Sequence, residues 1–156
     1  MDRDLIEKWN SRVRSGNTVY HCGDFAFYKD PAVISGIVKK LNGQIHLIRG
    51  NHDYANVIKK VTGFAWLGAS YQCKMAHVDK QLVFCSHYAM RIWDHPHHGA
   101  WGVFGHSHGG LPDDPNLLSC DVGVDAWNGY PVSFEELKAV MAKKSFVPID
   151  HHGKAS

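Results

Sequence analysis

Residues 45–53 read IHLIRGNHD, a short apolar run that passes through a glycine into a cluster of polar side chains. The run at residues 45–48 has the length and aliphatic content of a buried strand. Gly50 frees the backbone to turn sharply. An amide, an imidazole and a carboxylate then follow at Asn51, His52 and Asp53. The segment therefore predicts a buried strand that ends in a ligand-bearing loop.

Three other strand-length runs end in the same way, with nitrogen or oxygen donors directly after them. These junctions are residues 18–24 (TVYHCGD), 82–87 (LVFCSH) and 101–108 (WGVFGHSH). Ligands of open α/β sheets bind beyond the carboxyl ends of the strands. We therefore expect the four junctions to meet at one site.

Helical and strand patterns alternate along the chain, which indicates an α/β fold. Helices are predicted at residues 4–13, at 31–41 behind the capping Asp30, near Tyr54, and after Ser133, where Glu136 completes a capping-box spacing. Strands are predicted at residues 18–22, 45–48, 71–76, 82–85, 101–104 and 117–124. The early strands, separated by helices, should be parallel, and the later ones should form antiparallel hairpins. We expect one domain over residues 1–156, with a mixed sheet or two packed sheets.

Composition excludes several classes of protein. The 156 residues are 44% hydrophobic and 21% charged, which is typical of one globular domain rather than a disordered chain. No apolar run approaches the roughly 20 residues of a membrane helix, so we expect a cytoplasmic protein with no membrane partner. A net charge of +2 is too small to indicate tight binding to the phosphates of duplex nucleic acid. The four cysteines form no CxxC pair and are expected to be reduced and mostly buried.

The donors at the four junctions indicate a metal site. Aspartate, asparagine and histidine without thiolates suit Mn²⁺ best here, with Fe, Zn²⁺ or Ni²⁺ as alternatives. Two such ions about 3.5–4 Å apart would polarise a phosphate and generate hydroxide near neutral pH. The donor chemistry therefore points to phosphoester hydrolysis.

The order and spacing of Gly23-Asp24, the 50–53 motif GNHD, His87 and the 105–108 motif GHSH resemble the calcineurin-like metallophosphoesterases, in a small phage and bacterial branch. The resemblance implies an α/β/β/α sandwich of two mixed sheets and a site for two ions. It implies that Asp24 bridges the ions, that Asn51, His87 and His106 complete the first site, and that His108 serves the second. It further implies that His52 protonates the leaving oxygen and that Asp53 orients the His52 imidazole.

The sequence departs from this family pattern at its beginning. The family's first strand and the Asp-x-His motif that follows it are missing, so the second ion keeps only Asp24 and His108. Three accounts are open. The first is that the sequence begins inside a longer protein, the second that one firmly held ion suffices, and the third that donors from His95, His97, His98 or a second chain complete the second site.

We expect a metal-dependent phosphodiesterase that acts through a metal-bound hydroxide on small, including cyclic, nucleotide phosphodiesters. An alternative is a degenerate, non-catalytic domain that binds a metal or a nucleotide. A third interpretation takes Asn51-His52-Asp53 as the dyad of an all-helical HD-type phosphohydrolase.

The missing strand also predicts a homodimer, because an unpaired sheet edge invites association with a second chain. Light scattering at assay concentration should then give twice the chain mass of 17.5 kDa. A monodisperse monomer would rule the dimer out.

Overall fold

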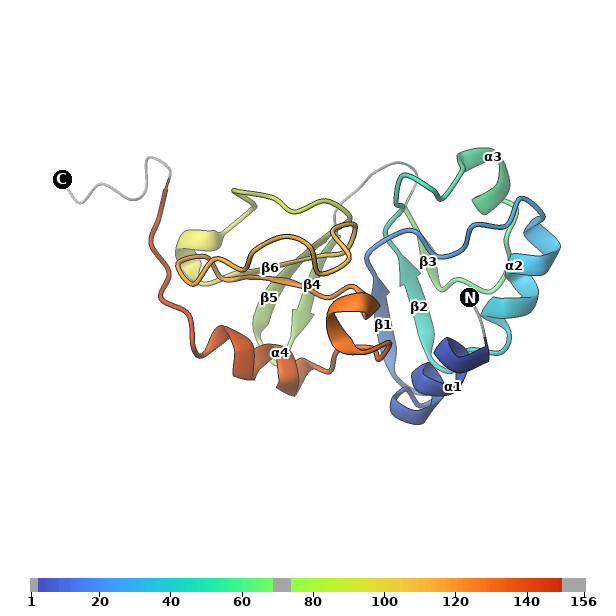
Figure 1. The fold of residues 1–156 in the computed structure, drawn as a ribbon, viewed down its shortest axis with the longest axis horizontal. Helices are drawn as coiled ribbons and strands as arrows, with labels where there is room; N and C mark the ends of the chain where they lie inside the picture. The colour runs from blue at the N-terminus through green and yellow to red at the C-terminus, as the bar shows by residue number, and fades with distance from the viewer. Residues whose placement is uncertain (1–2, 69–73, 150–156) are drawn as a thin grey trace.

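The computed structural model describes residues 3–68 and 74–149, which form two β-sheets with helices around them (Figure 1). The α-helices are α1 (Arg3–Arg12), α2 (Pro31–Val38), α3 (Ala55–Ile58) and α4 (Phe134–Met141). The strands are β1 (Thr18–His21), β2 (Gln44–Leu47), β3 (Trp66–Leu67), β4 (Lys74–Val78), β5 (Gln81–Ser86), β6 (Trp101–Phe104) and β7 (Ser119–Asp121). Two 3-10 helices are η1 (Pro96–His98) and η2 (Val124–Trp127).

The first sheet has the order β1-β2-β3, and its described strands are all parallel. Helices connect the strands, as the sequence predicted. Alternate side chains of β2 face opposite layers. Ile45 and Leu47 are fully buried beneath α1, α2 and α3, where they meet Trp9, Ile34 and other apolar residues.

The second sheet has the order β4-β5-β6-β7, and its pairing corrects one prediction. Among the described strands, only β4 and β5 form an antiparallel hairpin, whereas β5, β6 and β7 run parallel to one another. The expectation of hairpins among all the later strands was wrong. The segments 87–100 and 105–118 are long enough for parallel crossovers, which need a dozen or more residues but not an α-helix.

The two sheets share one core. Cys22 and Ile48, which directly follow β1 and β2, pack with Val83, Cys85 and Val103 of the second sheet. Leu137 and Met141 of α4 join the same cluster. Because these contacts lie directly below the ends of β1, β2, β5 and β6, they fix the loops that follow those strands relative to one another.

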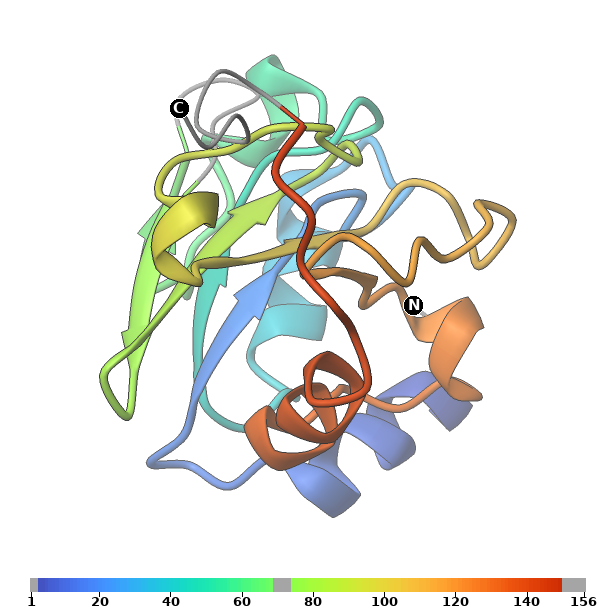
Figure 2. The same cartoon turned by 90° about the vertical axis from the view of Figure 1, so that its left-hand side faces the viewer.

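The outer face of the second sheet is covered by a loop. Figure 2 looks toward this side, where η1 and the segment after α4 lie in front of the strands. Trp93 is buried against Phe84, Ala100 and the bare backbone of Gly102, so it is a packing residue. A loop with one turn of 3-10 helix therefore occupies the place where the resemblance implies an outer layer of α-helix.

Two further differences concern short elements. The strand β3 was not predicted, since two residues carry too little pattern to be recognised. The strand expected at 117–124 is only β7, because the Asp121 side chain accepts a hydrogen bond from Gly123 N (2.8 Å) and turns the chain there. The strand expected at 71–76 is described only from Lys74 onward.

Seven described strands exclude the all-helical HD-type alternative.

Within the described ranges, every helix is too short or too polar to cross a membrane.

The capping box of α4 offers a test of the predicted helix start. Ser133 Oγ accepts from Glu136 N (3.2 Å), while the Glu136 carboxylate accepts from Ser133 N (2.9 Å) and its pKa is lowered by that bond. Ser133→Ala should lower the free energy of unfolding by about 1 kcal/mol in urea denaturation. Ser11→Ala, at an exposed position inside α1, should change it by less than about 0.5 kcal/mol. Equal effects of the two substitutions would contradict the cap.

Candidate metal centre

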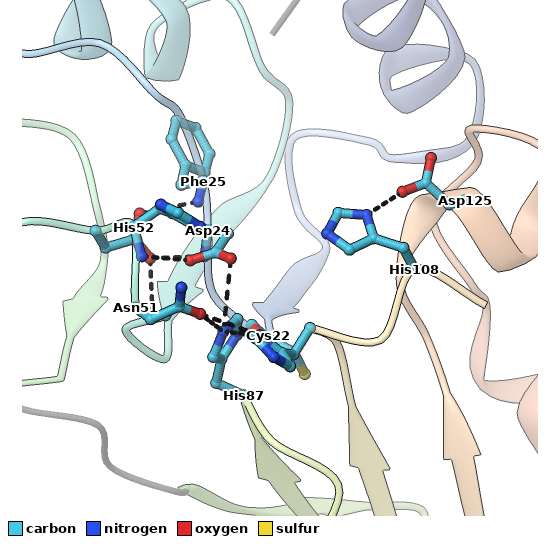
Figure 3. Close-up of polar contacts among 11 residues, drawn as sticks. Cys22, Asp24, Phe25, Asn51, His52, His87, His108 and Asp125 are labelled. Carbon is cyan, nitrogen blue, oxygen red and sulfur yellow. Dashed lines mark hydrogen bonds and ion pairs between the residues drawn. The ribbon is translucent and has the colours of Figure 1, made fainter. Parts of the chain in front are cut away.

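The ends of β1, β2, β5 and β6 bring four of the predicted ligands together (Figure 3). Asp24 follows β1, Asn51 follows β2, His87 follows β5, and His106 follows β6. Asp24, His87 and His106 form the one group of three or more side chains among the described residues that could hold a metal ion. The prediction that these junctions converge is confirmed.

The donor atoms of this cluster lie within contact distance of one another. Asn51 Oδ1 is 2.7 Å from His87 Nε2 and 3.0 Å from His106 Nδ1. The two imidazole nitrogens are 3.1 Å apart. Asp24 Oδ2 lies 3.5 Å from His87 Nε2. Four potential ligand atoms from four loops therefore face one small volume.

The tautomer of His87 follows from its second contact. His87 Nδ1 lies 2.7 Å from the Cys22 carbonyl oxygen, which can only accept a hydrogen bond, so Nδ1 carries the proton. Nε2 of the neutral ring then presents a lone pair toward Asn51 Oδ1, which is also an acceptor. Two acceptors this close require a cation or a proton between them, and without either the Asn51 amide would be turned so that Nδ2 donates to His87 Nε2. A backbone carbonyl that fixes the ligating tautomer is typical of metal-bound histidine.

The spacing of the donor atoms fits one bound ion. Metal–nitrogen and metal–oxygen bonds of about 2.0–2.2 Å place neighbouring ligand atoms roughly 3 Å apart. The four contacts above, at 2.7–3.5 Å, are close to this value, and the ligand atoms of Asp24, His87 and His106 all lie within 4.8 Å of one another. The donor set is nitrogen and oxygen without sulfur, as expected for a borderline or hard divalent cation.

Asp53 has a different role from the one the resemblance implied. Its carboxylate is 2% exposed and accepts hydrogen bonds from the backbone N–H groups of Asp24 (2.8 Å), Phe25 (2.9 Å) and Gly50 (2.8 Å). In the described structure no hydrogen bond joins this carboxylate to the His52 imidazole, so the predicted orienting contact is not formed. Asp53 instead ties the loop after β1 to the loop after β2.

Two glycines let these loops approach closely. A methyl group at Gly50 would overlap Asp24 Oδ1 and the Asp24 backbone nitrogen, and one at Gly23 would overlap His87 Nδ1. Gly23 also has φ = +92°, in the region that side chains disfavour. Any side chain at either position would push the ligands apart.

Three predicted ligands have left-handed backbones. The φ angles are +54° at Asp24, +50° at His106 and +49° at His108. Residues other than glycine rarely adopt this conformation, and such strain concentrates at functional sites. The backbone at these positions is therefore held by the surrounding loops.

His52 lies beside the cluster rather than in it. Its backbone N–H donates to Asp24 Oδ1 (2.8 Å), and its exposed ring lies 5.1 Å from the ring of Phe27. An exposed imidazole anchored next to Asp24 is free to contact a bound molecule and exchange a proton with it.

His108 lies apart from the other predicted ligands. Its Nδ1 pairs with Asp125 Oδ2, a residue at the start of η2, and it is not a member of the group formed by Asp24, His87 and His106 (Figure 3). Asp125 was missed as a site residue. In the sequence, Asp125 ends the segment 121–125 (DVGVD), which lies outside the four donor junctions.

The histidines on and beside η1 and the described cysteines lie outside the centre. The rings of His95, His97 and His98 cluster on and beside η1, and the ligand group in the described residues does not include them. Cys22, Cys85 and Cys120 are free and buried, as predicted, whereas Cys73 lies outside the described residues. Burial raises the pKa of Cys85 to about 12 and that of Cys120 to about 11, which disfavours the reactive thiolate.

Comparison with known proteins supports the fold. The chain is 28% identical over 153 residues to the uncharacterized protein MJ1445 of Methanocaldococcus jannaschii, a match that covers 94% of this chain and 78% of that protein. The structure of the present chain is similar to the crystal structure of the protein of unknown function AQ665 from Aquifex aeolicus. The TM-score is 0.65, and the sequences are 18% identical in a match that covers 88% of this chain and 83% of that one. No family model matches the sequence. The two-sheet α/β architecture is therefore shared with a solved structure.

The role of Asp53 can be tested by removing its charge. Asp53→Asn should lower the free energy of unfolding by about 2–3 kcal/mol, because the amide accepts fewer of the three buried N–H groups. Urea denaturation measures the change. Asp94→Asn, at a side chain that is 64% exposed, should change stability by less than about 0.5 kcal/mol. A mild effect of Asp53→Asn would contradict the proposed link between the loops.

Proposed function

We propose that this chain is a metal-dependent phosphoester hydrolase of the calcineurin-like metallophosphoesterase kind. The observation that carries the proposal is the convergence of Asp24, Asn51, His87 and His106 at distances that fit one divalent ion. The order of the motifs that supply these residues supports the phosphoester chemistry. Manganese is the ion we favour for this oxygen and nitrogen donor set.

Each ligand has a distinct task in this proposal. The Asp24 carboxylate supplies negative charge, Asn51 supplies a neutral oxygen, and His87 and His106 supply nitrogen donors. The Cys22 carbonyl keeps the His87 tautomer competent for ligation. A bound divalent cation supplies Lewis-acid polarisation of the phosphoryl oxygens and activates water as the nucleophile.

His52 is the proposed general acid. Its exposed ring is positioned by the bond from its own backbone to Asp24 and by the neighbouring Phe27 ring. When the phosphorus–oxygen bond breaks, the imidazolium transfers its proton to the departing alkoxide and is left neutral. Asp53 acts on this step through the backbone, since it holds the loop that carries both Asn51 and His52.

The proposed substrate is a small phosphodiester, including cyclic nucleotides, handled in the cytoplasm without duplex nucleic acid or a membrane as partner. A homodimer remains part of the proposal, because β1 forms an edge of the described sheet.

A second candidate is a non-catalytic domain that binds a metal or a nucleotide. The observation that favours it is the separation of His108 from the other ligands, which leaves one compact ligand group in the described residues. The two candidates share the metal site and differ in turnover.

Metal content and hydrolysis test the proposal together. The purified chain, loaded with Mn²⁺ and dialysed, should retain at least one ion per chain in elemental analysis. It should hydrolyse bis(p-nitrophenyl) phosphate faster than p-nitrophenyl phosphate in a Mn²⁺-dependent manner. Asn51→Ala and His87→Ala should each reduce metal affinity and hydrolysis by at least about 100-fold, because each removes a ligand.

His77→Ala provides the matched control, since His77 is an exposed histidine on β4. It should leave metal content and turnover unchanged. Metal retention without turnover would favour the non-catalytic domain. Absence of metal would mean that a proton or a hydrogen-bonding amide joins His87, His106 and Asn51, and both candidates would then be wrong.

A further inference from the structure

The pair formed by His108 and Asp125 lies outside the compact ligand group, and the proposed function gives Asp125 no task. His108 follows β6 and Asp125 lies in η2, which follows β7. Because β6 and β7 are parallel, the pair joins two loops at the carboxyl ends of these strands. Figure 3 shows the two side chains turned toward each other, apart from the group around Asp24.

The contact decides which nitrogen of His108 has a lone pair. A carboxylate accepts hydrogen bonds, so the proton of the neutral imidazole lies on Nδ1, next to Asp125 Oδ2. Nε2 then has the lone pair. In Figure 3 this second ring nitrogen is on the side of the ring that faces Asp24.

The backbone around the pair is fixed by another carboxylate. Asp121 Oδ2 accepts from Gly109 N (3.0 Å), and Asp121 Oδ1 accepts from Gly123 N (2.8 Å). The Asp121 carbonyl also accepts from the indole of Trp127 (2.8 Å). One residue thus clamps the loop that carries His108 to the turn that carries Asp125.

Stability alone does not explain this arrangement. The side chains of His108 and Asp125 are 66% and 57% exposed, and exposed pairs contribute little to folding. The chain contains a comparable exposed pair, Asp94 with His95 at 2.8 Å, but that pair lies in the loop before η1. His108 in addition has the left-handed backbone shared with Asp24 and His106.

We propose that Asp125 is a positioning residue: its carboxylate holds the His108 imidazole in the Nδ1–H tautomer and so leaves Nε2 unprotonated for the second divalent cation that the resemblance implies. This inference rests on the proposed metal site and adds a residue to it. The second ion has fewer protein ligands than the first and binds more weakly.

The tautomer can be measured on the metal-free protein. Ring ¹⁵N resonances of His108, recorded at pH about 8 where an ordinary imidazole is neutral, should show the Nδ1–H form. Asp125→Ala should shift His108 toward the Nε2–H form that free imidazole prefers. Asp125→Asn should retain much of the native tautomer through its amide oxygen. Asp94→Ala should leave His108 unchanged, and an unchanged tautomer in Asp125→Ala would overturn the proposal.

Titration with Zn²⁺, a diamagnetic probe, tests the second ion. The resonances of His87 Nε2 and His106 Nδ1 should respond at the lowest Zn²⁺ concentrations. The resonance of His108 Nε2 should respond only at higher concentrations. Asp125→Ala should weaken only the His108 step, by about 10- to 100-fold, as loss of a carboxylate behind a ligating histidine does. A His108 step that is absent, or unaffected by Asp125→Ala, would overturn the inference. Failure of the His87 and His106 step would instead contradict the proposed function.

Discussion

The candidate site depends on one buried carboxylate. Asp53 accepts hydrogen bonds from the backbone N–H groups of Asp24, Phe25 and Gly50, and so joins the loops after β1 and β2. The guanidinium of Arg49, itself buried, donates to the Asp53 carbonyl (3.2 Å) and stiffens the same turn. A buried anion that accepts three amide protons is costly to rearrange, because each released donor would remain buried without a partner. The positions of Asp24 and Asn51 follow from this bond set.

The second sheet supplies the other half of the site through a shared core. Cys22 packs in the cluster between the sheets, and its carbonyl oxygen accepts the proton of His87 Nδ1. A residue at the end of β1 therefore fixes the tautomer of a residue at the end of β5. The packing that stabilises the fold is thus linked directly to the geometry of the ligands. Gly23 and Gly50 make this possible, since any side chain there would separate the two sets of loops.

The predicted ligands differ in how firmly their side chains or backbones are held in place. The His87 ring is held by the buried Cys22 carbonyl and the Asp24 backbone by the buried Asp53 carboxylate, whereas His108 depends on the exposed Asp125. A ligand group built on buried partners is rigid before any ion binds. A ligand held by an exposed partner is positioned less firmly, which fits one strong and one weaker binding step.

The local sequence pattern alone determined several strands, the polar residues that follow them and two helix starts. Apolar runs followed by donors located β1, β2, β5 and β6 and the residues behind them, and the cap residues Asp30 and Ser133 located two helix starts. These features depend on neighbours within a few positions of the chain. The parallel order of β5, β6 and β7, the role of Asp53 and the partner of His108 depend on contacts between distant segments. Local sequence contains no record of those contacts, so only the tertiary structure decided them.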